Sequence, residues 1–164
     1  MTAALNRRGK EGAAAGLVAG VLFAIAQVLL AAVAGRPPTF VFRLVASVLL
    51  GRAAFDTTTL SGAIVVGTVV HLALSAFYGF VYGSLTAGLS DATQISSSRQ
   101  AALGLGFGAL VWLLNLEGIA RLAYPWFLGT PQLVELALHA AFFGLPLGLL
   151  YASAERRVPA ALRT

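Results

Sequence analysis

The two histidines of this 164-residue chain, His71 and His139, are the residues best suited to chemistry. Each lies in a long apolar stretch, and Glu135 precedes His139 by four positions, one helical turn. Neutral imidazole binds metal ions and also donates and accepts hydrogen bonds. The chain contains no cysteine, which excludes disulfides, thiolate metal sites, iron–sulfur clusters and cysteine nucleophiles.

Two amide residues, Gln27 and Asn115, occupy comparable positions in two further apolar stretches. Counting from the nearer end of each stretch, and at ~1.5 Å per helical residue, the four polar residues lie roughly 10–14 Å below the same surface. Unsatisfied polar groups are costly in hydrocarbon. We therefore expect Gln27, His71, Asn115 and His139 to face one another as a buried polar layer, with Glu135 one turn above.

A polar stripe continues from His71 along the same stretch. Ser75, Tyr78 and Tyr82 follow it, and all four fall within about 60° of one another at about 100° per helical residue. This face should point towards the protein interior.

The stretches that must position these residues have the composition of a membrane protein. The chain has 59% hydrophobic and 10% charged residues, whereas a soluble domain carries roughly 25% charged residues. Four runs, at about 12–34, 62–89, 101–124 and 132–152, are long enough to cross a bilayer. The sequence therefore predicts an all-α integral membrane protein with residues 1–164 as a single membrane domain.

The distribution of cations predicts the orientation. Seven cations fall on the side of the two termini, namely Arg7, Arg8, Lys10, Arg99, Arg156, Arg157 and Arg163. Four fall on the other side, namely Arg36, Arg43, Arg52 and Arg121. The positive-inside rule then places both termini in the cytoplasm and the protein in the inner membrane. The net charge of +5 does not indicate nucleic-acid binding, because the cations stand at the ends of apolar runs.

The segment at about 38–55, between the first two spans, is predicted to form one amphipathic helix in the membrane interface. Thr39, Arg43 and Ser47 fall on its polar side, and large apolar residues fill most of the rest. The helix could be a lid, a docking element or a simple connector.

An internal repeat is suggested by the first and third spans. Residues 13–27 and 101–115 align without gaps, and Gln27 meets Asn115; the second and fourth spans match more loosely, with His71 opposite His139. Small residues recur every four positions in these spans, which allows close helix packing. The repeat predicts two helical hairpins of the same orientation, related by a pseudo-twofold axis along the membrane normal.

The primary functional prediction is a non-enzymatic scaffold or accessory subunit, in which the polar layer fixes how the helices pack. An alternative is a haem b electron-transfer protein, with His71 and His139 as axial ligands and with Gln27, Asn115 and Glu135 orienting them. Further alternatives are a metal site at His71, His139 and Glu135, a quinone or lipid site, and transport. The expected partners are the lipid bilayer and either a larger membrane complex or further copies of the chain. No nucleophile elbow or phosphate-binding loop supports an enzyme.

Overall fold

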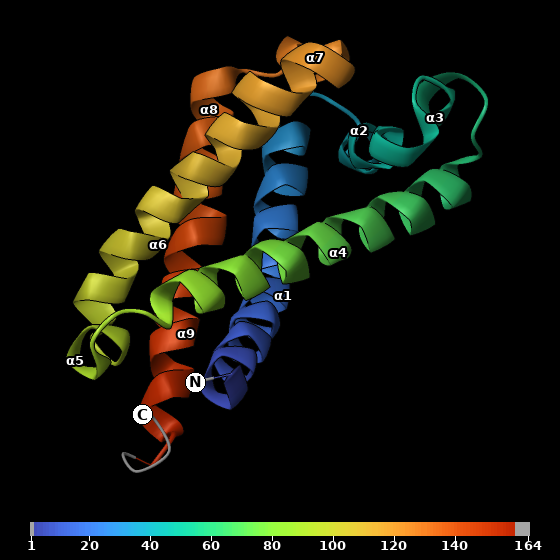
Figure 1. The fold of residues 1–164 in the computed structure, drawn as a ribbon. Coiled ribbons are helices and arrows are strands. Elements are labelled where there is room, and N and C mark those ends of the chain that lie inside the picture. The colour runs from blue at the N-terminus through green and yellow to red at the C-terminus, as the bar shows by residue number, and fades with distance from the viewer. Residues whose placement is uncertain (1, 160–164) are drawn as a thin grey trace.

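The computed structural model describes residues 2–159, which form helices and their connections with no β-strand. Four helical spans make up the body of the molecule, and the N- and C-terminal ends lie at the same end of it (Figure 1). We call this the terminal end and the other the distal end. Short helices cover the distal end (Figure 1).

The four predicted spans are confirmed as helices long and apolar enough to cross a membrane. The first is α1 (Thr2–Val33) and the second is α4 (Leu60–Thr86). The third comprises α6 (Ser97–Trp112), the π-helical η1 (Leu113–Ala120) and α7 (Arg121–Ala123). The fourth comprises α8 (Gln132–Leu138), the π-helical η3 (His139–Gly144) and α9 (Leu145–Arg157).

Both terminal helices run further than predicted. Helix α1 begins at Thr2, ten residues before the predicted start at 12, and α9 ends at Arg157 instead of 152. The additional residues are rich in Arg, Glu, Lys and Ala, which are strong helix formers. The hydropathy pattern marks where the apolar run stops, whereas the helix continues past it.

The prediction of one continuous helix over 38–55 is wrong. Helix α2 (Thr39–Leu50) ends at Gly51, and a separate short helix, α3 (Ala53–Asp56), follows. Gly51 has a φ of 57°, a left-handed value that glycine adopts without the steric cost of a side chain. The turn at Gly51 folds α3 back, so that Arg43 donates to the carbonyl oxygens of Ala54 and Thr58 at 2.6 and 3.0 Å.

Helix α2 also buries the face that its sequence marked as polar. Ala46 and Ser47 have no exposed surface, whereas Leu49 is 70% exposed. The helix packs across α4, where Gly67 lets the carbonyl oxygen of Phe42 approach closely. Small residues are buried here because two helix backbones meet, whereas Leu44 and Val48 face the cavity described below and Leu49 points outward.

Glycines hold α1 against α4 at backbone distance. A Cβ on Gly79 would lie 2.3 Å from the carbonyl oxygen of Gly12, and one on Gly16 would lie 2.4 Å from that of Ser75. Real Cβ atoms do not approach oxygen so closely, so neither position accepts a side chain without separating the helices. We call α1 and α4 the first pair.

The third and fourth spans form a second pair in the same manner. A Cβ on Gly104 would lie 2.2 Å from the carbonyl oxygen of Gly144, and one on Gly108 would lie 2.2 Å from that of His139. The two pairs meet through α1 and the fourth span, where Ala15, Ala19 and Phe23 pack with Phe143, Leu147 and Tyr151. Helices α4 and α6 approach each other near the terminal end and diverge towards the distal end (Figure 1). Helix α2 packs on the distal part of α4.

Candidate ligand-binding cavity

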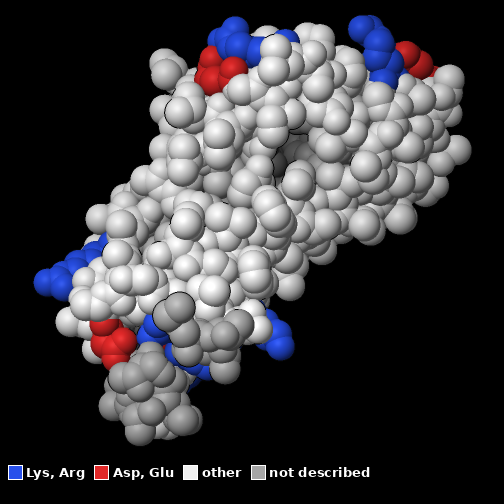
Figure 2. All heavy atoms as spheres, viewed as in Figure 1, with Lys and Arg blue, Asp and Glu red and all other residues white. Residues whose placement is uncertain are grey.

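A cavity of about 570 Å³ lies in the distal half of the molecule, between the two pairs. Its wall comes from all four spans, from α2 and from the 3₁₀ segment η2 (Pro125–Gly129), and it is mostly apolar. Figure 2 shows a hollow on this face, in the uncharged band between the charged groups at the two ends. The volume falls within the range of small-molecule sites, which are about 300–1,000 Å³ and mostly apolar with a few polar groups.

The predicted polar layer lines this cavity. Gln27 comes from α1, His71 from α4, Asn115 from η1, Glu135 from α8, and His139 from the start of η3. All five residues that depth and helical periodicity selected from the sequence therefore surround one space.

The predicted stripe on α4 is divided by the structure. Ser75 and Tyr78 line the cavity with His71. Tyr82 lies nearer the terminal end, where it is 2% exposed and donates to the side-chain oxygen of Gln100 at 2.5 Å. The stripe thus leads from the cavity wall into the packed terminal half.

Each histidine uses one ring nitrogen on a backbone carbonyl. The Nε2 atom of His71 lies 2.8 Å from the oxygen of Gly20, and the Nδ1 atom of His139 lies 2.7 Å from the oxygen of Glu135. Because a carbonyl oxygen only accepts, the bonded nitrogen carries the proton in each case. In a neutral imidazole the other nitrogen is then an acceptor, and neither has a partner among the described residues.

The amides of Gln27 and Asn115 and the carboxylate of Glu135 find hydrogen-bond partners for only some of their polar atoms. Gln27 donates through Nε2 to the Glu135 carboxylate at 3.3 Å, and Tyr78 donates to the side-chain oxygen of Asn115 at 2.6 Å. The Oε1 atom of Gln27 is buried and has no partner among the described residues. A layer that served packing alone would be expected to close its hydrogen bonds on itself.

Both π-helical segments adjoin the cavity. Asn115 lies in η1 and His139 is the first residue of η3. A π turn holds more residues than an α turn and so rotates the side chains that follow, and such turns are frequent at functional sites. A sequence signal for η3 exists: Pro146 lacks an N–H, and in an α-helix its ring would clash with the carbonyl of Phe142.

The residues predicted as metal ligands share the cavity wall but do not converge. Among residues 2–159, no three His, Asp or Glu side chains lie close enough together to hold a metal ion. The ring of Phe23 packs against both imidazoles, with centroid distances of 5.7 Å to His71 and 4.6 Å to His139. Haem ligation by both histidines needs a flat space between them, so Phe23 makes this site a poorer fit for a porphyrin than for a smaller polar group.

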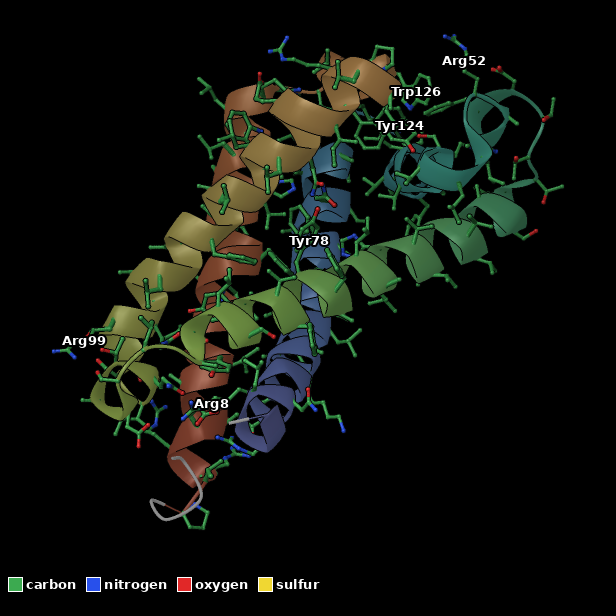
Figure 3. The ribbon with its side chains drawn as sticks, viewed as in Figure 1. Arg8, Arg52, Tyr78, Arg99, Tyr124 and Trp126 are labelled. Carbon is green, nitrogen blue, oxygen red and sulfur yellow. The ribbon has the colours of Figure 1, made fainter. Side chains whose placement is uncertain are left out.

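Helix α2 closes the distal end of the cavity. Trp126 donates from its indole nitrogen to Ser47 Oγ at 2.7 Å, and the Tyr124 hydroxyl donates to the Val48 carbonyl at 3.2 Å. Figure 3 shows both aromatic residues beside α2. The connection between the third and fourth spans therefore holds α2 in place.

We expect Trp126→Phe to lower the free energy of unfolding by about 0.5–1.5 kcal/mol, because it removes the hydrogen bond to Ser47. Trp112→Phe is the matched control, since the buried Trp112 indole nitrogen has no partner among the described residues. Thermal unfolding in detergent, followed by circular dichroism, measures both variants. Equal effects of the two substitutions would contradict the proposed role of the Trp126 bond.

A charged cluster at the terminal end was missed by the sequence analysis. Glu155 has no exposed surface and accepts two hydrogen bonds from Arg7, at 2.9 and 3.2 Å. Both residues lie outside the predicted apolar runs; Arg7 entered only the cation count, and Glu155 was assigned no role. Only the packing of α1 against α9 brings them together.

No family model, curated protein or solved structure matches this chain. The geometry of the cavity is therefore the basis for a functional assignment.

Proposed function

We propose that this protein binds a membrane-soluble molecule with an apolar body and a polar end that carries hydroxyl donors. The observation that carries the proposal is the 570 Å³ cavity, in whose wall polar groups remain without partners. Neutral glycerolipids, isoprenoid alcohols and quinols belong to this chemical class.

The preference for a donor follows from the hydrogen-bonding inventory of the wall. Gln27 Oε1 and one nitrogen on each histidine are acceptors without a partner among the described residues. The side-chain NH₂ of Asn115 is the principal donor left over. A ligand with one or two hydroxyl groups would donate to one or two of these three acceptors, whereas a group that only accepts would leave all three unpaired.

The route to the cavity also favours a lipid-soluble ligand. The hollow in Figure 2 lies in the uncharged band of the surface, and Tyr78 extends from α4 into the space that separates it from η1 (Figure 3). A molecule dissolved in the acyl-chain region would reach this opening directly. The hydrogen bond from Tyr78 to Asn115 spans the same gap.

We infer that the two pairs are a structural repeat. Gly16 packs on Gly79 as Gly104 packs on Gly148. The spacing between equivalent residues of α4 and the fourth span changes by one along the helices: it is 68 positions from His71 to His139 and 69 positions from Gly79 to Gly148. The π-helical η3 lies between His139 and Gly148 and accounts for the one additional residue.

The same offset of 69 positions relates Tyr82 to Tyr151, and these two buried rings contact each other with a centroid distance of 5.6 Å. Equivalent residues of two repeats meet in this way on a twofold axis. The contact thus supports the pseudo-twofold arrangement of two hairpins with the same orientation.

We further propose an inner-membrane location with both termini in the cytoplasm. The cation count supports this orientation, although Arg163 lies outside the described residues. Reporter fusions at residue 164 and in the 34–38 connection would test it. Activity of a cytoplasm-dependent reporter at the connection would overturn it.

The primary prediction from the sequence, a scaffold or accessory subunit, and the haem b alternative both stay predictions. A scaffold or accessory subunit would copurify with a partner protein and carry no ligand. A haem b protein is favoured only by the presence of both histidines on one cavity, and a Soret band in the purified protein would reveal it.

The test is to purify the protein in a mild detergent, extract it with organic solvent and identify bound molecules by mass spectrometry. We expect about one hydroxyl-bearing amphiphile per chain. Gln27→Leu removes the unpaired acceptor and should weaken binding by about three- to tenfold, the equivalent of one hydrogen bond.

The matched control is Gln132→Leu, the same change at a half-buried amide outside the cavity wall, whose Oε1 is likewise buried without a partner among the described residues. It should leave occupancy unchanged. An extract with no such molecule, or equal binding by all three proteins, would overturn the proposal.

A further inference from the structure

The terminal half of the molecule contains an ionic cluster, centred on the buried Glu155, that joins the two pairs. Arg7 on α1 binds Glu155 on α9 through two hydrogen bonds and Glu11 at 2.7 Å. The guanidinium of Arg8 lies 3.9 Å from the Glu155 carboxylate, measured from Nε to Oε1. It also lies 3.4 Å from the carboxylate of Asp91, the first residue of the short helix α5 (Asp91–Gln94). We call this group the terminal clamp.

Polar side chains connect the cavity to the terminal clamp. Below Ser75 and Tyr78 come Tyr82 and Tyr151, in ring contact, and then Glu155, one turn further along α9 than Tyr151. Tyr82 bonds to Gln100 at 2.5 Å, and both residues are buried. Packing alone favours apolar residues at such positions, and ionisable residues within membrane proteins commonly mark a pathway.

The contacts within each pair differ in kind from those between the pairs. Within a pair, glycines bring the backbones of two helices together, so that no side chain can adjust the fit. Between the pairs, ion pairs, hydrogen bonds and side-chain packing make the contact. The backbone contacts within a pair make each pair a rigid unit. The polar contacts between the pairs can be replaced by hydrogen bonds to water.

We propose that the protein is a transporter, in which the two pairs rock against each other and expose the cavity alternately through the hollow in the distal half and at the terminal end. The structure shows the distal half hollow and the terminal half closed by the Tyr82–Tyr151 contact and the terminal clamp. The identity of the transported molecule rests on the proposed function, but the opening of the terminal end does not depend on it. Rocking of rigid repeats about a central site is the general mechanism of such proteins.

The absence of cysteine allows a direct test by labelling. Ser75→Cys reports on the cavity, Thr86→Cys on the buried region beyond Tyr82, and Ser98→Cys on the exposed terminal surface. Each single-cysteine protein is reconstituted in vesicles of known orientation and treated from the terminal side with a membrane-impermeant maleimide. We expect rapid labelling of Ser98→Cys and slow labelling of the other two.

Glu155→Gln weakens the terminal clamp and should raise the labelling rate of both Ser75→Cys and Thr86→Cys from the terminal side by at least tenfold. Glu155→Asp, which keeps the carboxylate, should retain slow labelling. If Glu155→Gln does not fold, Tyr82→Phe with Tyr151→Phe removes polar contacts without leaving a charge unpaired, and the same rates are measured.

Faster labelling of Thr86→Cys alone would show that the terminal end frays without opening the cavity, and would overturn the proposal. Unchanged labelling of both positions in a folded variant would overturn it as well. Either result leaves ligand binding intact, because the mass-spectrometric test of bound amphiphile is independent of access from the terminal side.

Discussion

Gly104→Ala is expected to lower the free energy of unfolding by about 1–3 kcal/mol, because the added methyl group overpacks a backbone contact. Its Cβ would lie 2.2 Å from the carbonyl oxygen of Gly144, so the third and fourth spans must separate to admit it. Reversible unfolding in mixed micelles, followed by circular dichroism, gives the free energy.

Gly106→Ala, two positions along the same helix, is the matched control. A Cβ on Gly106 would have no neighbour within 4 Å, so alanine should be neutral or stabilise the helix by up to about 0.5–1 kcal/mol. Gly16→Ala in the first pair should behave like Gly104→Ala, because its Cβ would lie 2.4 Å from the carbonyl oxygen of Ser75. Equal stabilities of the Gly104 and Gly106 variants would show that the pairs are not held at backbone distance.

Filling the cavity should abolish ligand binding without unfolding the protein. Ala31 and Ala120 line the cavity from α1 and η1, and they are 8% and 3% exposed. The double variant Ala31→Phe with Ala120→Phe places two aromatic rings in the space that the apolar body of the ligand would occupy. We expect occupancy in the purified protein, measured by mass spectrometry of the extract, to fall at least tenfold.

The control for this variant places the same rings on the exposed surface of the protein. Val33 and Leu122 are 86% and 90% exposed, and they lie two positions from the filled residues. Val33→Phe with Leu122→Phe should retain the wild-type amount of bound amphiphile. Full occupancy of the cavity-filled protein would locate the ligand elsewhere and refute the assignment of the cavity.

The contrast between the two experiments separates the roles of the glycines and the cavity. Gly104→Ala acts on how two helices pack, and its effect is on stability. The filled cavity acts on the space between the pairs, and its effect is on occupancy. If the polar layer served only to hold the helices together, no variant would lose bound ligand while keeping the wild-type free energy of unfolding. We expect the cavity-filled variant to do so.

The sequence by itself determined the four apolar helices and the polar layer of the cavity wall. Hydropathy is a local property of the sequence, and the thickness of the bilayer sets the length of apolar run, about 20 residues, that a spanning helix needs. Gln27, His71, Asn115, Glu135 and His139 were identifiable because depth along a helix and angle around it follow from residue number alone. The small residues that pack α1 on α4 were visible for the same reason.

Tertiary structure alone decided the cavity and the burial of Ser47. These features depend on which backbones meet, and a local pattern does not encode the distance between helices. Ser47 is buried because α2 lies across α4 and beneath Trp126. A sequence window centred on Ser47 contains neither partner.

The division of the polar stripe and the terminal clamp were likewise decided by long-range packing. Tyr82 leaves the cavity because Tyr151 and Gln100 surround it, and Glu155 is buried because Arg7 reaches it from the other end of the chain. Periodicity assigns a residue to a face of its own helix. Which residues of the other helices meet that face is fixed only when all four spans pack together.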